Sequence, residues 1–92
     1  MQTNRLTVLG EVSPFEQSAW LPAVNGRHYE LLALSAKYYV CQFETDTSPV
    51  TALQQLSRLH PGLVLLLGYE TGRSMGMALV KAGDINDYCV LY

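Results

Sequence analysis

Residues 37–69, KYYVCQFETDTSPVTALQQLSRLHPGLVLLLGY, contain the clearest structural pattern in the chain. From position 37 to position 44 the side chains alternate between two faces, which is the period of a β-strand. One face carries Tyr39, Cys41 and Phe43, and the other carries Tyr38, Val40, Gln42 and Glu44. The alternation predicts a strand over 37–44 and leaves open which of its two faces is covered.

A strong helix signal follows this strand. Asp46–Pro49 combines short polar side chains, which accept hydrogen bonds from free N–H groups, with a proline whose φ suits the first helical turn. One stripe at helical spacing then carries Ala52, Leu53, Leu56 and Leu59. Pro61-Gly62 ends the helix, and residues 63–69 are apolar on both faces, which is typical of a strand with neighbours on each side. We predict the main helix over 49–59 and a strand over 63–69.

The N-terminal part of the chain is less regular. Residues 5–12 alternate and predict a first strand. Ser13-Pro14 indicates the start of a short helix, which we expect to end near Trp20 because Pro22 stops it, with a loop over 21–27. Residues 28–34 are rich in Leu and Ala, so both strand and helix stay open there.

The C-terminal part predicts a hairpin. Glu70–Arg73 is typical of a hairpin turn, and residues 75–81 return as the partner strand. After a break at 82–84, residues 85–92 form either a last edge strand or a short turn followed by a strand. We therefore predict an α+β fold in which one antiparallel sheet of four to five strands carries one main helix and a short N-terminal helix.

The composition fits one domain over residues 1–92. Hydrophobic residues make up 49% of the chain and charged residues 15%, enough apolar material for one compact core. The formal net charge of −2 provides no basic surface for phosphates, which argues against direct nucleic-acid binding. The longest apolar run, Leu63–Leu67, is far shorter than the about 20 residues that span a bilayer, and no secretion signal is visible. We expect a cytoplasmic protein without a membrane span.

The cysteines and histidines predict no catalytic or metal site. Cys41 and Cys89 match no metal-binding or redox spacing. We interpret both as reduced core thiols, with a bridge between adjacent strands as the alternative. His28 opens a strand, and His60 lies at a helix end, where an imidazolium is favoured by the helix dipole. No cofactor is expected.

Three carboxylates near the C-terminus offer the best case for an enzyme. Asp84 and Asp87 are close in sequence, with Glu70 as a third candidate, and paired carboxylates can hold a divalent ion or run acid–base chemistry. Asp84–Asp87 also fits an ordinary polar loop. We favour the loop, and we expect that the protein is not an enzyme.

Two stretches resemble a known family. Asn4–Gly10 (NRLTVLG) resembles the opening strand of the YubB-type ferredoxin-like domains, small proteins commonly carried by phages and plasmids. Phe43–Pro49 (FETDTSP), followed by a helix and by Tyr69–Gly72 (YETG), is similar to a later part of the same domains. The tryptophan-containing segments of the family are absent, with Lys37 alone at the place of one of their lysines. The resemblance implies a ferredoxin-like fold and a mobile-element setting, and it transfers no catalytic residue.

The predicted helices are too few to cover both faces of the sheet. If the helix over 49–59 covers the face of Tyr39, then Tyr38 and Val40 stay on the other face. A contiguous apolar patch left in water marks a contact site in most monomers. The alternative is that Phe15 and Trp20 of the short helix fold over this face.

These observations predict a protein that binds another protein. The most specific hypothesis is a phage or prophage accessory protein that inhibits a host defence ribonucleoprotein by stoichiometric binding, in the manner of an anti-CRISPR protein. The candidate interface combines aromatic and arginine anchors with acidic side chains for a basic partner: Tyr38, Val40, Glu44, Tyr69, Glu70, Arg73, Asp84 and Asp87. The alternatives are a metal-dependent hydrolase that uses Asp84 and Asp87, and a homo-oligomeric module whose uncovered sheet face buries itself.

Overall fold

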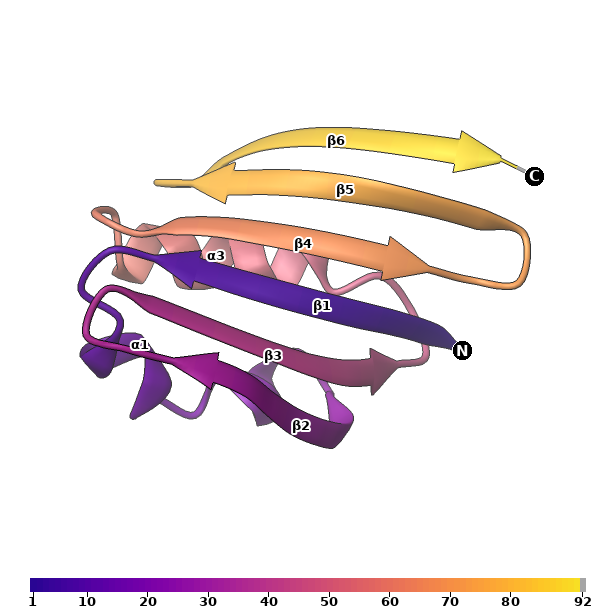
Figure 1. Cartoon of the computed structure of the whole chain (residues 1–92). Coiled ribbons are helices and arrows are strands. Elements are labelled where there is room, and N and C mark those ends of the chain that lie inside the picture. Colours follow the sequence, from indigo (N-terminus) through magenta and orange to yellow (C-terminus); the bar gives the residue numbers. More distant parts are fainter. Residues whose placement is uncertain (92) are drawn as a thin grey trace.

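The chain forms a six-stranded antiparallel sheet with three short helices (Figure 1). The computed structural model describes residues 1–91, with side chains for residues 1–87. In chain order the elements are β1 (Gln2–Leu9), α1 (Ser13–Glu16), α2 (Trp20–Ala23), β2 (Arg27–Leu34), β3 (Tyr38–Thr45), α3 (Val50–Leu59), β4 (Val64–Glu70), β5 (Ser74–Lys81) and β6 (Asp84–Leu91). The strands lie in the order β2-β3-β1-β4-β5-β6.

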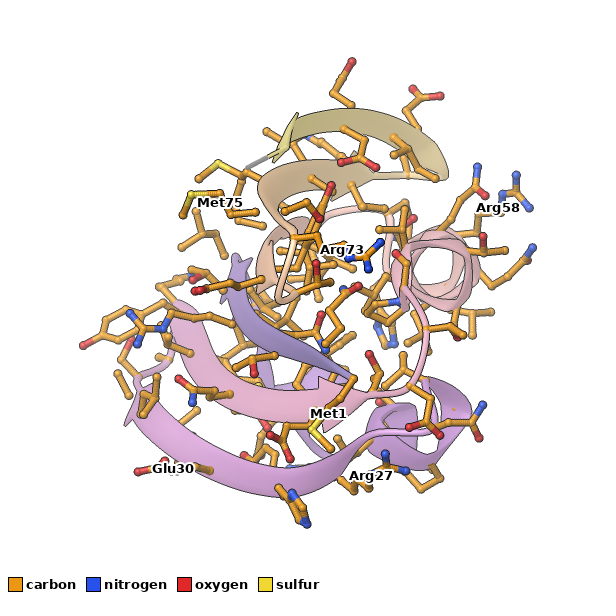
Figure 2. All side chains as sticks on the ribbon, turned by 90° about the vertical axis from the view of Figure 1, so that its right-hand side faces the viewer. Met1, Arg27, Glu30, Arg58, Arg73 and Met75 are labelled. Carbon is orange, nitrogen blue, oxygen red and sulfur yellow. The ribbon has the colours of Figure 1, made fainter. Side chains whose placement is uncertain are left out.

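The first strand occupies the middle of the sheet. β1 lies between β3 and β4 and is antiparallel to both, so β3 and β4 run parallel to each other and need a crossover connection. α3 makes this crossover, and α1 with α2 connects β1 to β2. All three helices lie on the same side of the sheet (Figures 1 and 2). We call this side the helix face.

The hydrophobic core lies between the helix face and the helices. The sheet contributes alternate apolar residues from four strands, among them Leu6, Val8, Tyr39, Cys41, Phe43, Leu65, Leu67, Ala78 and Val80. Helix α3 contributes Val50, Leu53 and Leu56, and it packs against β4, β5 and β6. The predicted alternation of 37–44 and the main helix are therefore confirmed, and the covered face of β3 is the one that carries Tyr39.

An aromatic cluster covers the other half of the helix face. Phe15 of α1 is fully buried and stacks on Trp20 of α2, with ring centroids 5.4 Å apart. Trp20 meets Tyr39 and Phe43 of β3 edge-on, at 6.1 and 5.3 Å. The alternative that Phe15 and Trp20 cover the Tyr38 side of the sheet is wrong. Because α3 lies over β4 to β6, these two rings are needed to cover the core side of β3.

The short N-terminal helix differs from the expectation. It is two single turns, α1 and α2, rather than one helix that ends near Trp20, and α2 occupies part of the expected loop. Pro22 lies inside α2, as its third residue. It does not stop this helix because the first four N–H groups of a helix have no helical partner in any case.

The sheet has six strands rather than four to five. Residues 84–91, for which the sequence left a choice, pair with β5 from Asp84 to Leu91. Asp84–Asp87 is therefore part of a strand and not a loop. Ala82 and Gly83 both have positive φ angles, 49° and 86°, which is the geometry of a two-residue hairpin turn that matches the twist of its strands.

Residues 28–34, which could have been strand or helix, form strand β2 at one edge of the sheet. The pairing of β2 with β3 is interrupted by two irregularities, one between Arg27 and Glu30 and one between Leu31 and Ala33. The first coincides with a φ of 55° at His28, so a bulge re-aims this side chain.

A polar network is buried at one end of the core. Asn4 is fully buried on the helix face of β1. Its Nδ2 donates to Oγ1 of Thr45 at 3.0 Å and to the carbonyl of Phe43 at 3.4 Å, and its Oδ1 accepts from Nε2 of Gln2 at 2.7 Å. The free-energy cost of burying this amide is low because both of its polar atoms have hydrogen-bond partners.

Within residues 1–91, no helix combines the length and the apolar character that a bilayer crossing requires.

Candidate protein-binding face

The side of the sheet opposite the helices carries no element of the described chain (Figure 2). We call it the open face and define it by alternate residues of four strands: Thr3, Arg5, Thr7 and Leu9 of β1; Tyr38, Val40, Gln42 and Glu44 of β3; Val64, Leu66, Gly68 and Glu70 of β4; Met75, Met77, Leu79 and Lys81 of β5. Every one of these residues is exposed or half-buried. Strand alternation places them together, because their neighbours in the sequence form the core.

The strand register arranges the open face in rows across the sheet. The first row is Tyr38, Leu9 and Val64, and the second is Val40, Thr7, Leu66 and Leu79. The third row is Gln42, Arg5, Gly68 and Met77, and the fourth is Glu44, Thr3, Glu70 and Met75. The first two rows are almost entirely apolar, whereas the last two hold most of the polar side chains.

The two apolar rows and Met77 form a continuous hydrophobic band over β3, β1, β4 and β5. Four large side chains in it are well exposed: Leu9 at 40%, Tyr38 at 43%, Met77 at 56% and Leu79 at 37%. Val40, Val64 and Leu66 lie between them and are half-buried. Directly paired residues on one face of a sheet have neighbouring Cβ atoms, so water contacts an apolar surface that crosses four strands.

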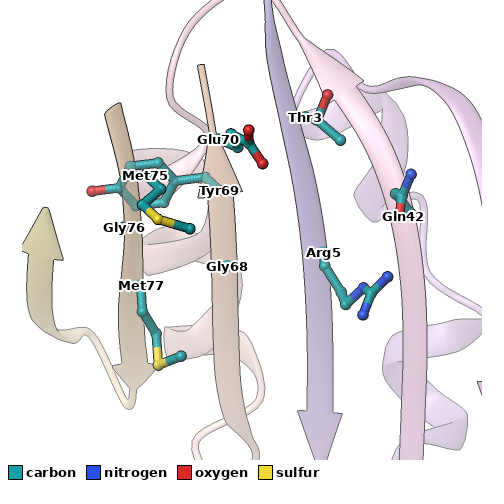
Figure 3. A pocket seen from close by; sticks show the side chains of 9 residues that line it. All are labelled: Thr3, Arg5, Gln42, Gly68, Tyr69, Glu70, Met75, Gly76 and Met77. Atoms are coloured by element: carbon teal, nitrogen blue, oxygen red, sulfur yellow. The ribbon is translucent and has the colours of Figure 1, made fainter. Parts of the chain in front are cut away.

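A hollow of about 340 Å³ interrupts the polar rows (Figure 3). Gly68 forms its floor, because a glycine between Arg5 and Met77 leaves a gap in the row of side chains. Arg5 and Glu70 line this hollow from neighbouring strands. Neither side chain makes a hydrogen bond or ion pair with another residue in the described part of the chain, so both charges are available to a partner.

One acidic residue of the open face already has a partner. Glu44 is half-buried, and its Oε1 pairs with Nδ1 of His28, which the bulge in β2 directs toward it. Two further surface ion pairs lie away from the open face. Lys37 pairs with Glu11, and Arg27 binds Asp46 with two guanidinium nitrogens, which lowers the pKa of Asp46 below its usual range.

The structure brings together five of the eight residues that the sequence analysis selected. Tyr38, Val40, Glu44 and Glu70 all lie on the open face. Asp84 lies on the same side of the sheet, on β6 beside Lys81. The other three lie elsewhere: Tyr69 and Asp87 on the helix-face side, and Arg73 in the turn between β4 and β5.

Tyr69 and Asp87 form a contact of their own. The Tyr69 hydroxyl donates to Oδ1 of Asp87 at 2.8 Å, although β5 lies between their strands. The residue of β5 that pairs with Tyr69 is Gly76, which has no side chain to obstruct the ring. The glycine at position 76 therefore lets the Tyr69 side chain reach across β5 to Asp87.

The carboxylates considered for metal binding do not converge. Asp84 pairs with Lys81 and Asp87 with Ala78, and residues three apart in a strand point to opposite faces. No group of three potential metal ligands occurs among the described residues.

Cys41 is a buried free thiol, as predicted. Burial in the core raises its pKa to about 12, so it stays protonated and unreactive at neutral pH. The side chain of Cys89 lies outside the described residues. Desolvation also raises the pKa of the neighbouring Tyr39, whose hydroxyl lies 2.5 Å from that of Tyr29.

The sequence analysis missed several members of the open face, notably Arg5, Leu9, Met77 and Leu79. Alternation within each strand was a usable signal for each of them. It cannot tell which set of residues in β1 or β5 shares a face with Tyr38, because that depends on the pairing register between strands.

Comparison of the chain with protein-family models, with curated proteins and with solved structures gave no match.

Proposed function

We propose that this protein acts by binding another protein through the open face of its sheet. The observation that carries the proposal is the hydrophobic band of the two apolar rows and Met77, which no helix of the described chain covers. Exposed apolar patches of this extent on a sheet are typical of contact sites. The polar rows beside the band supply the rim that specific interfaces need.

The side chains of the face suit this role. Tyr38 and Arg5 belong to the residue types that dominate binding energy in protein interfaces. The methionines at positions 75 and 77 are flexible and polarizable, and such side chains adapt to the shape of a partner. The acidic residues contribute less than the sequence suggested, because Glu44 is paired with His28.

We further propose that the first part of the chain is a ferredoxin-like unit of the YubB type. In support, β1, the pair α1–α2, β2, β3, α3 and β4 follow one another in the β-α-β-β-α-β order of such units. The added strands β5 and β6 would then widen the open face beyond that of the basic unit.

A test of the binding face uses a photoreactive residue. Benzoylphenylalanine in place of Tyr38 should form a covalent adduct with a protein when cells that express the chain are irradiated. The matched control replaces Leu59, an apolar residue of α3 that is 73% exposed on the helix side, and should give no adduct. Equal yields at the two positions, or no adduct at Tyr38, would contradict the proposal.

The narrower form of this proposal is an inhibitor of a host defence complex, acting in the host cytoplasm. Its support is the YubB-type resemblance of Asn4–Gly10 and Phe43–Pro49. Expression in a bacterium with an active CRISPR system should then raise the survival of a targeted phage. Met77→Lys, which places a charge in the hydrophobic band, should abolish the protection. Unchanged phage survival with the native chain would reject the inhibitor hypothesis and leave the binding face to be judged by the crosslinking experiment.

A further inference from the structure

We infer that the open face is covered by a second copy of this chain, packed face to face about a two-fold axis that runs along the strands between β1 and β4. The inference rests on the proposed function, since it names the partner for the same face. Its basis is that the rows of the open face complement themselves under this rotation.

The sheet has the symmetry that such a dimer needs. In the order β2-β3-β1-β4-β5-β6, the middle of the sheet falls between β1 and β4. A two-fold axis along this line lays β1 of one copy over β4 of the other, and β3 over β5. It also keeps every row over the same row, so apolar rows meet apolar rows. Closed two-fold dimers of this kind are the commonest oligomers of soluble proteins.

The apolar rows match residue by residue. Leu9 of one copy comes to lie over Val64 of the other, because both belong to the first row. In the second row, Val40 meets Leu79 in the same way. Each contact occurs twice, and the hydrophobic bands of both copies are removed from water. Packed sheets cross at about 30°, which displaces the outer strands most and the central β1 and β4 least.

The hollow in the third row of one copy has room for the Arg5 side chain of the other copy. Arg5 pairs with Gly68 in the register of each sheet, so the rotation lays Arg5 of one copy over Gly68 of the other. The missing side chain of Gly68 provides room for the guanidinium. Glu70 lies two residues further along β4, about 7 Å away, and lines the same hollow. Arg5 and Glu70 have no hydrogen-bond or ion-pair partner among the described side chains of residues 1–87, and the dimer gives each of them one.

The charges in the middle of the open face favour a two-fold axis along the strands. Glu44 is already paired with His28, so Arg5 and Glu70 are the charges in the middle of the open face that two copies can pair with each other. A two-fold axis across the strands is a poorer solution, because it would lay the row of Glu44 and Glu70 over the row of Tyr38 and Leu9. Only the axis along the strands joins like rows and opposite charges.

A charge-swap experiment on the full chain tests this arrangement. Sedimentation velocity should show a dimer for the native protein, and Arg5→Glu or Glu70→Arg alone should weaken it at least about tenfold, since each single change creates two like-charge contacts. An equimolar mixture of the two variants should recover the dimer, because every contact in the mixed pair again joins opposite charges. The double variant carrying both changes should also dimerise.

Two control variants keep the experiment specific. Arg58→Glu on α3 and Glu16→Arg on α1 change the same charges at exposed positions of the helix side and should leave the dimer unchanged. Circular dichroism checks that every variant is folded, which we expect because Arg5 and Glu70 are exposed.

Two results would overturn the inference. The first is a native chain that stays monomeric at about 1 mM, since even weak specific association is detected at this concentration. A dimer that persists in both single variants uses a different surface. If the chain is monomeric but benzoylphenylalanine at Tyr38 captures a different protein, the second copy is rejected and the proposed function stands. If benzoylphenylalanine at Tyr38 captures no protein, both the second copy and the proposed function are rejected.

Discussion

Phe15→Ala is expected to lower the free energy of unfolding by about 3–5 kcal/mol, the usual cost of removing a buried phenylalanine ring. Phe15 is fully buried and contacts Trp20, Tyr39 and His60 through ring edges or faces at centroid distances of 5.4 to 6.4 Å. The cavity cannot close easily, because α1 is a single turn held by the same contacts. Since domains of this size have about 5–15 kcal/mol of stability, the variant should be close to unfolding.

Urea denaturation followed by the fluorescence of Trp20 measures this loss directly, because the chain has one tryptophan and it stacks on Phe15. Glu16→Ala is the matched control, since Glu16 lies in the same turn and is exposed. Its effect should stay within about 0.5 kcal/mol. A Phe15→Ala variant as stable as this control would show that the aromatic cluster does not anchor α1 and α2 to the sheet.

Asn4→Asp should destabilise the protein by about 3–5 kcal/mol at neutral pH, because it places an unpaired charge in the core. The change is nearly isosteric, so packing is preserved. The donor that binds Thr45 Oγ1 at 3.0 Å and the carbonyl of Phe43 at 3.4 Å is replaced by an acceptor. An ionised carboxylate then faces a carbonyl oxygen without water to solvate it.

The loss in Asn4→Asp should depend on pH with a definite sign. Burial raises the pKa of the introduced carboxyl above its unfolded value of about 3.9, so the folded state binds the proton more tightly. The variant is therefore least destabilised below about pH 4, and stability is lost as the pH rises through the higher folded pKa. Denaturation of the variant and the native protein from pH 4 to pH 7 should show the difference growing with pH.

Asn86→Asp provides the control for this titration. Asn86 is exposed on β6, so the same chemical change there should leave the pH dependence of the native protein almost unaltered. If the Asn4→Asp difference were the same at pH 4 and pH 7, the network around Asn4 would not exclude water. Both large predictions concern the helix face, so their effects on folding can be separated from effects of open-face variants on binding.

Local patterns in the sequence were sufficient for the elements whose residues carry opposite preferences on their two sides. In β3, the alternation of Tyr39, Cys41 and Phe43 with a second set of residues predicted a strand, and the structure buries these three side chains. The main helix was predicted within one residue at its start. Its capping residues, its apolar stripe and Pro61-Gly62 all act within a few residues of one another.

Residues without such a contrast were decided by their surroundings. In β2, Leu31, Leu32 and Leu34 are all 40–48% exposed, so no alternation separates a core side from a water side. Their preference for helix is overruled by hydrogen bonding along β3. Pro22 was expected to stop a helix and instead lies in the first turn of one, because its effect depends on where that helix begins.

The amino-acid sequence by itself determined that this chain is α+β, with a strand at 37–44, a helix close to 49–59 and more apolar surface than its helices can cover. Periodicity and capping are local properties, and they need no knowledge of the rest of the chain. Only the tertiary structure decided which surface stays uncovered. Phe15 and Trp20 join the helix face, and register brings Arg5, Tyr38, Glu70 and Met77 to the open one. Pairing between distant strands sets that register, because a shift of one residue would exchange the two faces.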